Sequence, residues 1–221
     1  MFRPLALAAG AVLVLGGCSV ELGTDSPDPS ASRPPGSSGT DSKGALEDLG
    51  TLKIEEERNG SSYDRKAFGT PWKDVDGNRC DTRNDILARD LVSVTKKDDG
   101  CIVLSGTLED DPYSDEKVSF TRSKPSAVQI DHIYPLALAW RLGADAWSSD
   151  RRAEFANDPA NLLAVSGRPN QQKGDSGPGE WKPPADYQCT YAGMFITVAK
   201  KYDLPVIKAD HAALGDFLET C

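Results

Sequence analysis

Residues 129–135 read QIDHIYP, and this stretch holds one of the two histidines of the chain. The apolar residues before it predict a short strand over residues 127–130, with Asp131 and His132 directly after the strand. From Pro135 onward a helix is expected, because proline is tolerated in the first helical turn and apolar residues follow. The Asp131-His132 pair is therefore predicted to lie where a strand ends.

Residues 161–173 read NLLAVSGRPNQQK. The apolar run predicts a second strand over residues 161–165, followed by a turn at Ser166 and Gly167. Pro169-Asn170 then marks the start of a helix. The resulting order is strand, Asp-His pair, crossover, strand, turn and helix.

Further elements are expected on both sides of this unit. Helices are predicted over residues 45–57, 82–90, 144–156, 186–201 and 208–219, and strands over residues 101–107 and 117–121. Residues 63–80 are expected to be irregular and fixed by three aromatic side chains, Tyr63, Phe68 and Trp72. These elements predict a single α+β domain over residues 45–221, with its core at about residues 117–175.

The first residues read MFRPLALAAGAVLVLGGC and are expected to be a secretion signal, because an early arginine precedes a short apolar run and small residues. Leu15-Gly16-Gly17-Cys18 resembles the lipobox of bacterial lipoproteins. Residues 1–17 would then be removed and Cys18 lipidated, which predicts an extracytoplasmic protein anchored to the bacterial cell membrane; a plain secretory signal is the alternative. Residues 18–44 are rich in Ser, Pro, Gly and Asp and predict a disordered tether.

Four cysteines remain after Cys18, namely Cys80, Cys101, Cys189 and Cys221. An even number of cysteines in an oxidising compartment predicts two disulfides. Their order along the chain favours Cys80 with Cys101 and Cys189 with Cys221, although four cysteines allow three pairings. A zinc site of all four cysteines is the alternative, but no CxxC spacing supports it.

The formal net charge of −9 argues against a protein that simply coats nucleic acid, because phosphate neutralisation requires Lys and Arg. The charge is unevenly distributed, however. Residues 121–201 carry ten Lys and Arg against eight Asp and Glu, so the acidity lies largely upstream of the two decisive stretches.

Several motifs together, including YDRKAFG, CDTRNDIL, QIDHIYPLALAW and NLLAVSGRPNQQK, resemble secreted HNH-family endonucleases related to the C-terminal domain of GmrSD-type restriction enzymes. The resemblance runs from about Tyr63 to Cys221 and implies a ββα-metal (His-Me finger) core with flanking helices. A DH pair alone is weak evidence. The step of nine residues from Asn161 to Asn170, with Lys173 three residues later, makes the pattern far more specific.

The resemblance also implies a role for each matching residue. His132 corresponds to the general base, since neutral imidazole can take a proton from water near pH 7. Asp131 corresponds to the charged metal ligand, and Asn170 occupies the final position of the HNH signature as a second oxygen ligand. Two oxygen ligands favour Mg²⁺ or Mn²⁺ over Zn²⁺.

The remaining positions are expected to support these groups. Asn161 is expected to order the loop between the strands, Lys173 to contact phosphate from the helix turn after Asn170, and Arg83 to be a second phosphate clamp. One departure from the family concerns the residue before the cysteine of the CDTR motif, which is often glycine and is Arg79 here. It affects a local turn and not the site.

The predicted function is a metal-dependent endonuclease that cleaves DNA, with RNA an open alternative. Low sequence preference is expected, since the sequence contains no separate base-reading module. The protein is expected to be a monomer. A catalytically idle lipoprotein that binds nucleic acid or a cell-envelope partner through the same fold is the alternative function.

Overall fold

The computed structural model describes residues 41–58 and 60–221 of the chain. The predicted leader, Cys18 and the tether as far as residue 40 lie outside these residues. Within the described ranges, no helix combines the length and the apolar character needed to span a bilayer.

Strands β4 (Val128–His132) and β5 (Leu162–Ser166) form an antiparallel pair, and α5 (Gly167–Lys173) packs against both of them. Asp131 and His132 were expected just past the strand, and that prediction is wrong. Both residues belong to β4, and their backbones pair with Leu163 and Leu162. The apolar pattern ends before them, but the backbone ladder continues because these polar side chains find partners inside the protein. The pair thus lies on rigid backbone.

A second sheet has the order β1-β2-β3, built from Val92–Lys96, Val103–Leu108 and Val118–Thr121. β1 was not predicted, because its sequence VSVTK is short and contains only two apolar residues, Val92 and Val94. Helix α2 (Thr82–Asp90) packs on this sheet and begins at Asp81, whose side chain accepts a hydrogen bond from the backbone N–H of Asn84. That cap agrees with the predicted helix start.

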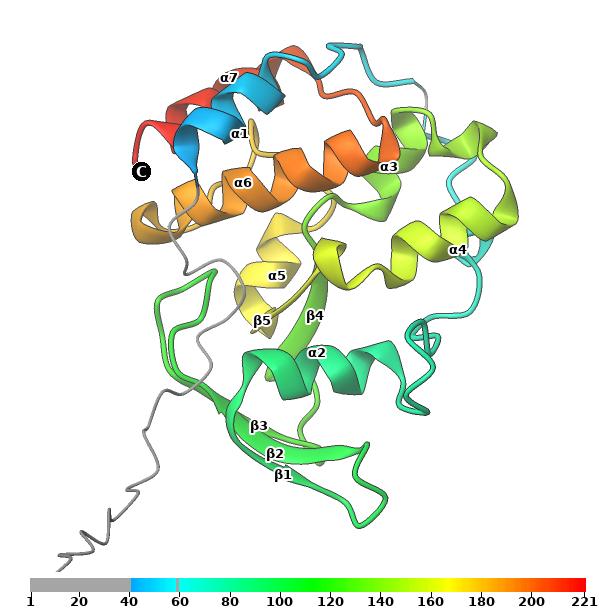
Figure 1. Cartoon of the computed structure of the whole chain (residues 1–221), viewed down its shortest axis with the longest axis vertical. Helices are drawn as coiled ribbons and strands as arrows, with labels where there is room; N and C mark the ends of the chain where they lie inside the picture. The colour runs from blue at the N-terminus through cyan, green and yellow to red at the C-terminus, as the bar shows by residue number, and fades with distance from the viewer. Residues whose placement is uncertain (1–40, 59) are drawn as a thin grey trace, which may run out of the picture. The chain divides into compact units, whose positions relative to one another are not determined.

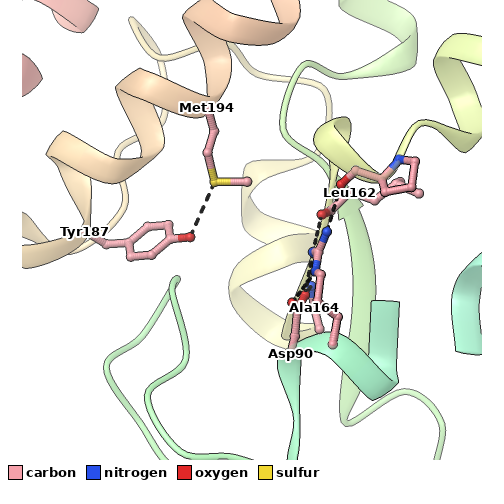
Figure 2. Close-up of polar contacts among 7 residues, drawn as sticks. Asp90, Leu162, Ala164, Tyr187 and Met194 are labelled. Atoms are coloured by element: carbon pink, nitrogen blue, oxygen red, sulfur yellow. Dashed lines mark hydrogen bonds and ion pairs between the residues drawn. The ribbon is translucent and has the colours of Figure 1, made fainter. Parts of the chain in front are cut away.

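The end of α2 also fixes β5. The Asp90 carboxylate accepts a hydrogen bond from the Ala164 N–H at 2.9 Å, and the Arg89 guanidinium donates to the Leu162 carbonyl at 2.7 Å. Figure 2 shows Asp90, Leu162 and Ala164 side by side at this junction. Both bonds join α2 to the edge of β5 that does not pair with β4. β5, the strand paired with His132, is therefore hydrogen-bonded along both of its edges.

A helical layer covers the other side of the ββα unit. α6 (Ala185–Tyr202), α7 (Lys208–Leu218) and α1 (Ser42–Leu49) pack against one another, as the orange, red and blue helices of Figure 1 show. The helix predicted over 45–57 is shorter than expected and begins earlier. It ends before Gly50, and Ile54 instead pairs with Val206 in an isolated bridge.

Between β4 and β5 the chain forms α3 (Leu136–Arg141), the short 3₁₀ helix η2 (Ala144–Ala146), α4 (Ser149–Asn157) and the 3₁₀ helix η3 (Pro159–Asn161). The single helix predicted over 144–156 is thus two pieces. Trp147 is extended, and the Ser148 side chain caps α4 by accepting from the Arg151 N–H. A further 3₁₀ helix, η1 (Arg65–Phe68), lies in the segment predicted to be irregular and packs on α4.

Both predicted disulfides are present. Cys80 is bonded to Cys101, joining the segment before α2 to the β1-β2 hairpin, and Cys189 of α6 is bonded to Cys221 just beyond α7. All four cysteines are consumed, so they form no zinc site. The described residues form one α+β domain, as predicted.

Candidate active site

His132 is the last residue of β4 and is buried, at 7% exposure. Its ring Nε2 lies 2.9 Å from the carbonyl oxygen of Ala156 on α4. A carbonyl oxygen can only accept a hydrogen bond, so Nε2 carries the proton in this pair. The second ring nitrogen, Nδ1, then keeps its lone pair and can act as a base.

The surroundings of His132 also favour the neutral imidazole. Burial lowers the pKa of His132 to about 4, and the nearby positive charges of Arg65 and Lys173 lower it further. The hydrogen bond to Ala156 and the charge of Asp131 oppose this shift. The ring is therefore uncharged at neutral pH.

Asp131 is buried beside two partners that fix its carboxylate. Its Oδ2 accepts a hydrogen bond from the Tyr113 hydroxyl at 2.6 Å and is ion-paired with Lys173 Nζ at 2.9 Å. Burial, reinforced by the charge of Asp131, raises the pKa of Tyr113 well above its usual value, so the hydroxyl keeps its proton. Tyr113 was missed from sequence, because it lies in the turn-rich DDPYSD stretch, which carries no signal of contact with β4.

Lys173 does not play the part predicted for it. Its side chain is fully buried, and besides Asp131 its Nζ donates to the carbonyl oxygen of His132 at 3.0 Å. Its Nζ therefore faces Asp131 and the end of β4, and Lys173 does not line the polar pocket where the predicted phosphate contact would be made. It instead balances the charge of Asp131 and joins α5 to the end of β4.

Asn161 is completely buried and braces the segment that follows His132. Its side-chain oxygen accepts from the Tyr134 N–H at 2.8 Å, and its Nδ2 donates to the Tyr134 carbonyl at 3.2 Å. Its own backbone carbonyl accepts from the Ile133 N–H at 2.9 Å. Three bonds from one residue thus fix the two positions after the histidine.

Asn170 lies on α5, and its Nδ2 donates to the side-chain oxygen of Gln129 at 2.9 Å. Gln129 is two residues before Asp131 on β4 and was not assigned a role from sequence. This bond turns the amide so that Oδ1 points away from Gln129. Among the described residues, Asn170 Oδ1 and Asp131 Oδ1 accept no hydrogen bond, whereas Asp131 Oδ2 is held by Tyr113 and Lys173.

Two pockets meet at His132. The first, here called the polar pocket, has a volume of about 470 Å³ and is lined by Tyr63, Arg65, Asp131, His132, Asn170 and Asp175 among others. The second, the apolar pocket, has a volume of about 350 Å³ and is lined by Arg65, Phe68, Pro71, Trp72, His132 and Leu136 among others. His132, Arg65 and Leu136 line both pockets.

Arg83, predicted as a phosphate clamp, is not brought to this site. Its guanidinium donates to the Val128 carbonyl at 3.2 Å and lies 6.0 Å from the centre of the Trp72 ring. Val128 is at the opposite end of β4 from His132, about 13 Å away at roughly 3.3 Å per residue. The cation that does line both pockets is Arg65, which belongs to the YDRKAFG motif but was not selected from it.

The polar pocket fits a hard divalent cation. Asp131 and Asn170 offer a carboxylate and an amide oxygen on its wall, and Mg²⁺ accepts few protein oxygens because it retains several waters. In the described part of the chain, no three His, Cys, Asp or Glu side chains gather into a metal-binding group. A carboxylate and an amide oxygen are ligand types that Mg²⁺ and Mn²⁺ take, whereas a catalytic Zn²⁺ takes three protein ligands.

Comparison with known proteins gives two matches. The family model described as GmrSD restriction endonucleases, C-terminal domain, matches residues 81–217. A protein of Arthroderma benhamiae (strain ATCC MYA-4681 / CBS 112371) named "Uncharacterized secreted protein" is 40% identical over 176 residues, which cover 78% of this chain and 82% of that protein. No solved structure matches the chain. The family match contains the whole ββα unit but not residues 63–72.

Proposed function

Because this chain belongs to the family of GmrSD restriction endonuclease C-terminal domains, an HNH endonuclease family, we propose that it is an extracytoplasmic, metal-dependent endonuclease. Its substrate is DNA, in which it hydrolyses phosphodiester bonds with low sequence preference. The observation that carries this proposal is the position of His132. Its Nε2 is held by the Ala156 carbonyl, which leaves Nδ1 free to act as a base in a residue that lines the same pocket as Asp131 and Asn170.

Phosphodiester hydrolysis requires an activated water, neutralisation of charge on the phosphate and stabilisation of the departing oxygen. His132 Nδ1 accepts the proton of the attacking water, and Ala156 keeps the ring in the required orientation and tautomer. Asp131 and Asn170 would hold Mg²⁺, which would supply positive charge near the phosphate and the departing oxygen.

The neighbouring residues act on the groups that do the chemistry. Lys173 and Tyr113 hold Oδ2 of Asp131, so that its other oxygen keeps a defined position. Asn161 braces the backbone after His132. Arg65 lines the pocket as an exposed cation and takes over the phosphate contact first assigned to Arg83 and Lys173.

The proposed location follows from the leader and from the secreted relative. Two disulfides in the domain agree with an oxidising compartment. Lipidation of Cys18 would anchor the chain at the membrane surface. A Cys18→Ser chain is then expected in the culture medium, whereas the unaltered chain is expected in the membrane fraction.

A metal-screened cleavage assay tests the proposed activity. The purified protein is incubated with supercoiled plasmid, single-stranded DNA or RNA in the presence of Mg²⁺, Mn²⁺ or Zn²⁺. Nicking of DNA with Mg²⁺ or Mn²⁺ that stops on addition of EDTA is the expected result. Binding of nucleic acid without cleavage under every metal would support the idle binding protein instead.

A further inference from the structure

The apolar pocket is not used by the mechanism above, although it opens beside the general base. Its wall combines His132, Arg65 and Leu136, which it shares with the polar pocket, with Phe68, Pro71 and Trp72. The two pockets therefore adjoin, so a group that fills this one can be joined by a few bonds to a phosphate in the polar pocket. Its volume of about 350 Å³ lies within the range of small-molecule sites.

Trp72 is the residue that characterises this pocket. Its ring is half-buried, and its backbone has a φ of +60°, which is uncommon for a bulky side chain. Neighbouring bonds hold this conformation, since the Lys73 N–H donates to Asn157 Oδ1 at 2.9 Å and the Lys73 carbonyl accepts from the Thr82 hydroxyl. The Arg83 guanidinium also lies near the indole ring. The flat side chain is thus presented to the pocket by a fixed segment.

The charges at this pocket favour a polyanion. Arg65 and Lys66 line it, are exposed, and form no ion pair among the described residues. Asp64 is the acid nearby, and one of its oxygens accepts from the backbone N–H of Lys66, which caps η1. An apolar pocket lined by two exposed cations and one acid, Asp64, suits an aromatic group attached to a phosphate.

We propose that the apolar pocket binds a nucleobase, stacked on Trp72, from a nucleotide adjacent to the phosphate that is cut. This inference rests on the proposed nuclease function and adds the form of the substrate. A base can enter the pocket only after it leaves its stack in a duplex, which costs free energy. Single-stranded or frayed nucleic acid is therefore the preferred substrate, without selection of base identity, because every base has a face that can stack.

Cleavage of a single-stranded oligonucleotide that carries one abasic residue tests this inference. The cut rate of the bond next to the abasic residue is compared with that of the same bond in the intact strand. The wild type is expected to cut the abasic position roughly 5- to 140-fold more slowly, the range that corresponds to one lost base–aromatic stack. In Trp72→Ala the intact strand should be cut at this slower rate, and the abasic residue should make no further difference.

Two further variants separate stacking from folding. Trp72→Phe keeps an aromatic face and should retain most of the abasic effect, whereas Trp72→Leu keeps an apolar side chain but should lose it. A readout without catalysis uses an oligonucleotide containing the fluorescent base 2-aminopurine, mixed with wild type or Trp72→Leu in EDTA. Quenching by the wild type and less quenching by Trp72→Leu is expected.

The possible failures are distinguishable. If the wild type cuts no intact strand under any metal, the proposed nuclease function is wrong. If it cuts intact and abasic strands equally, or if Trp72→Leu keeps the full abasic effect, the pocket does not bind a base.

Discussion

The walls around His132 come from two regions that are built differently. The ββα unit of β4, β5 and α5 supplies Asp131 and His132 on buried, paired strand backbone and the half-buried Asn170 from α5, and it lies inside the family match. The segment of residues 63–72 supplies Arg65 and Trp72 on a short 3₁₀ helix and turns, mostly exposed and outside that match. In the proposed function, the rigid unit would supply the reacting groups and the exposed segment would hold the substrate.

The largest effect on stability is expected inside the unit, at Lys173. Lys173→Met leaves the Asp131 carboxylate buried without its cation, which should lower the free energy of unfolding by about 3 to 5 kcal/mol. Cleavage should fall as well, because Asp131 loses its position. Urea denaturation and cleavage rates measure both effects, with the exposed Lys208→Met on α7 as the control. Unchanged stability in Lys173→Met would show that the buried pair does not hold the unit together.

Asp210 is a buried carboxylate without a lysine partner, and its effect on the free energy of unfolding can be compared with that of the Asp131–Lys173 pair. It is fully buried on α7, its Oδ1 accepts from the Gly179 N–H, and its Oδ2 has no partner among the described residues. Burial raises the pKa of Asp210 from 3.8 to about 6. The folded state therefore holds this proton more tightly than the unfolded state does, and the resulting stability is present below pH 4 and lost as the pH rises through about 6.

The loss on going from pH 4 to pH 7 amounts to up to about 3 kcal/mol for a shift of this size. Asp210→Asn cannot titrate, so its free energy of unfolding should lack this decrease. Urea denaturation of both proteins between pH 4 and pH 7 measures the difference. Parallel pH profiles would contradict the assignment.

In the outer segment, Arg65 should affect activity and not stability. Arg65→Ala removes the exposed cation of both pockets and should lower kcat/KM on DNA by roughly 10- to 100-fold. Arg83→Ala is the comparison for the arginine first predicted as the clamp: its guanidinium donates to the start of β4 and lies near Trp72, so it should change cleavage less and only through the position of Trp72. An equal or larger loss in Arg83→Ala would reverse this assignment.

The smallest effect is expected at Arg79, between the two regions. Its φ of +73° is in the left-handed range that glycine adopts readily, so arginine is strained at this position. Arg79→Gly should raise the free energy of unfolding by about 0.5 to 1 kcal/mol without changing cleavage. Lys73→Gly, at a position without positive φ, should instead be destabilising in the same thermal unfolding measurement.

The sequence predicted the order of the ββα unit because its information is local. The apolar runs and the spacing of Asn161, Asn170 and Lys173 all lie within a few turns of chain. Contacts between distant residues could not be predicted, such as that of Tyr113 with Asp131, because no pattern relates a loop tyrosine to a strand 18 residues away. Lys173 was correctly predicted on the helix after Asn170, but its ion pair with Asp131 was not predicted. Helical periodicity does not show whether a side chain lines a pocket or pairs with a buried carboxylate.

The same limit applies to the outer segment. Arg65 and Trp72 lie in a stretch without periodicity, so neither could be assigned to a pocket wall before the position of η1 was known. Arg83, by contrast, was predicted to contact phosphate because of its CDTR motif. Its guanidinium donates to the Val128 carbonyl at the start of β4, whereas His132 lies at the end of that strand.

The central claim is that His132 is the general base, and the two histidines of the chain allow a direct test. Single-turnover cleavage of DNA with Mg²⁺ is measured for wild type, His132→Ala and His211→Ala, with circular dichroism to establish folding. The cleavage rate of His132→Ala should be lower by roughly 10²- to 10⁴-fold. His211 lies on α7, and the rate of His211→Ala should match that of the wild type. Equal rates for wild type and a folded His132→Ala protein would contradict the account.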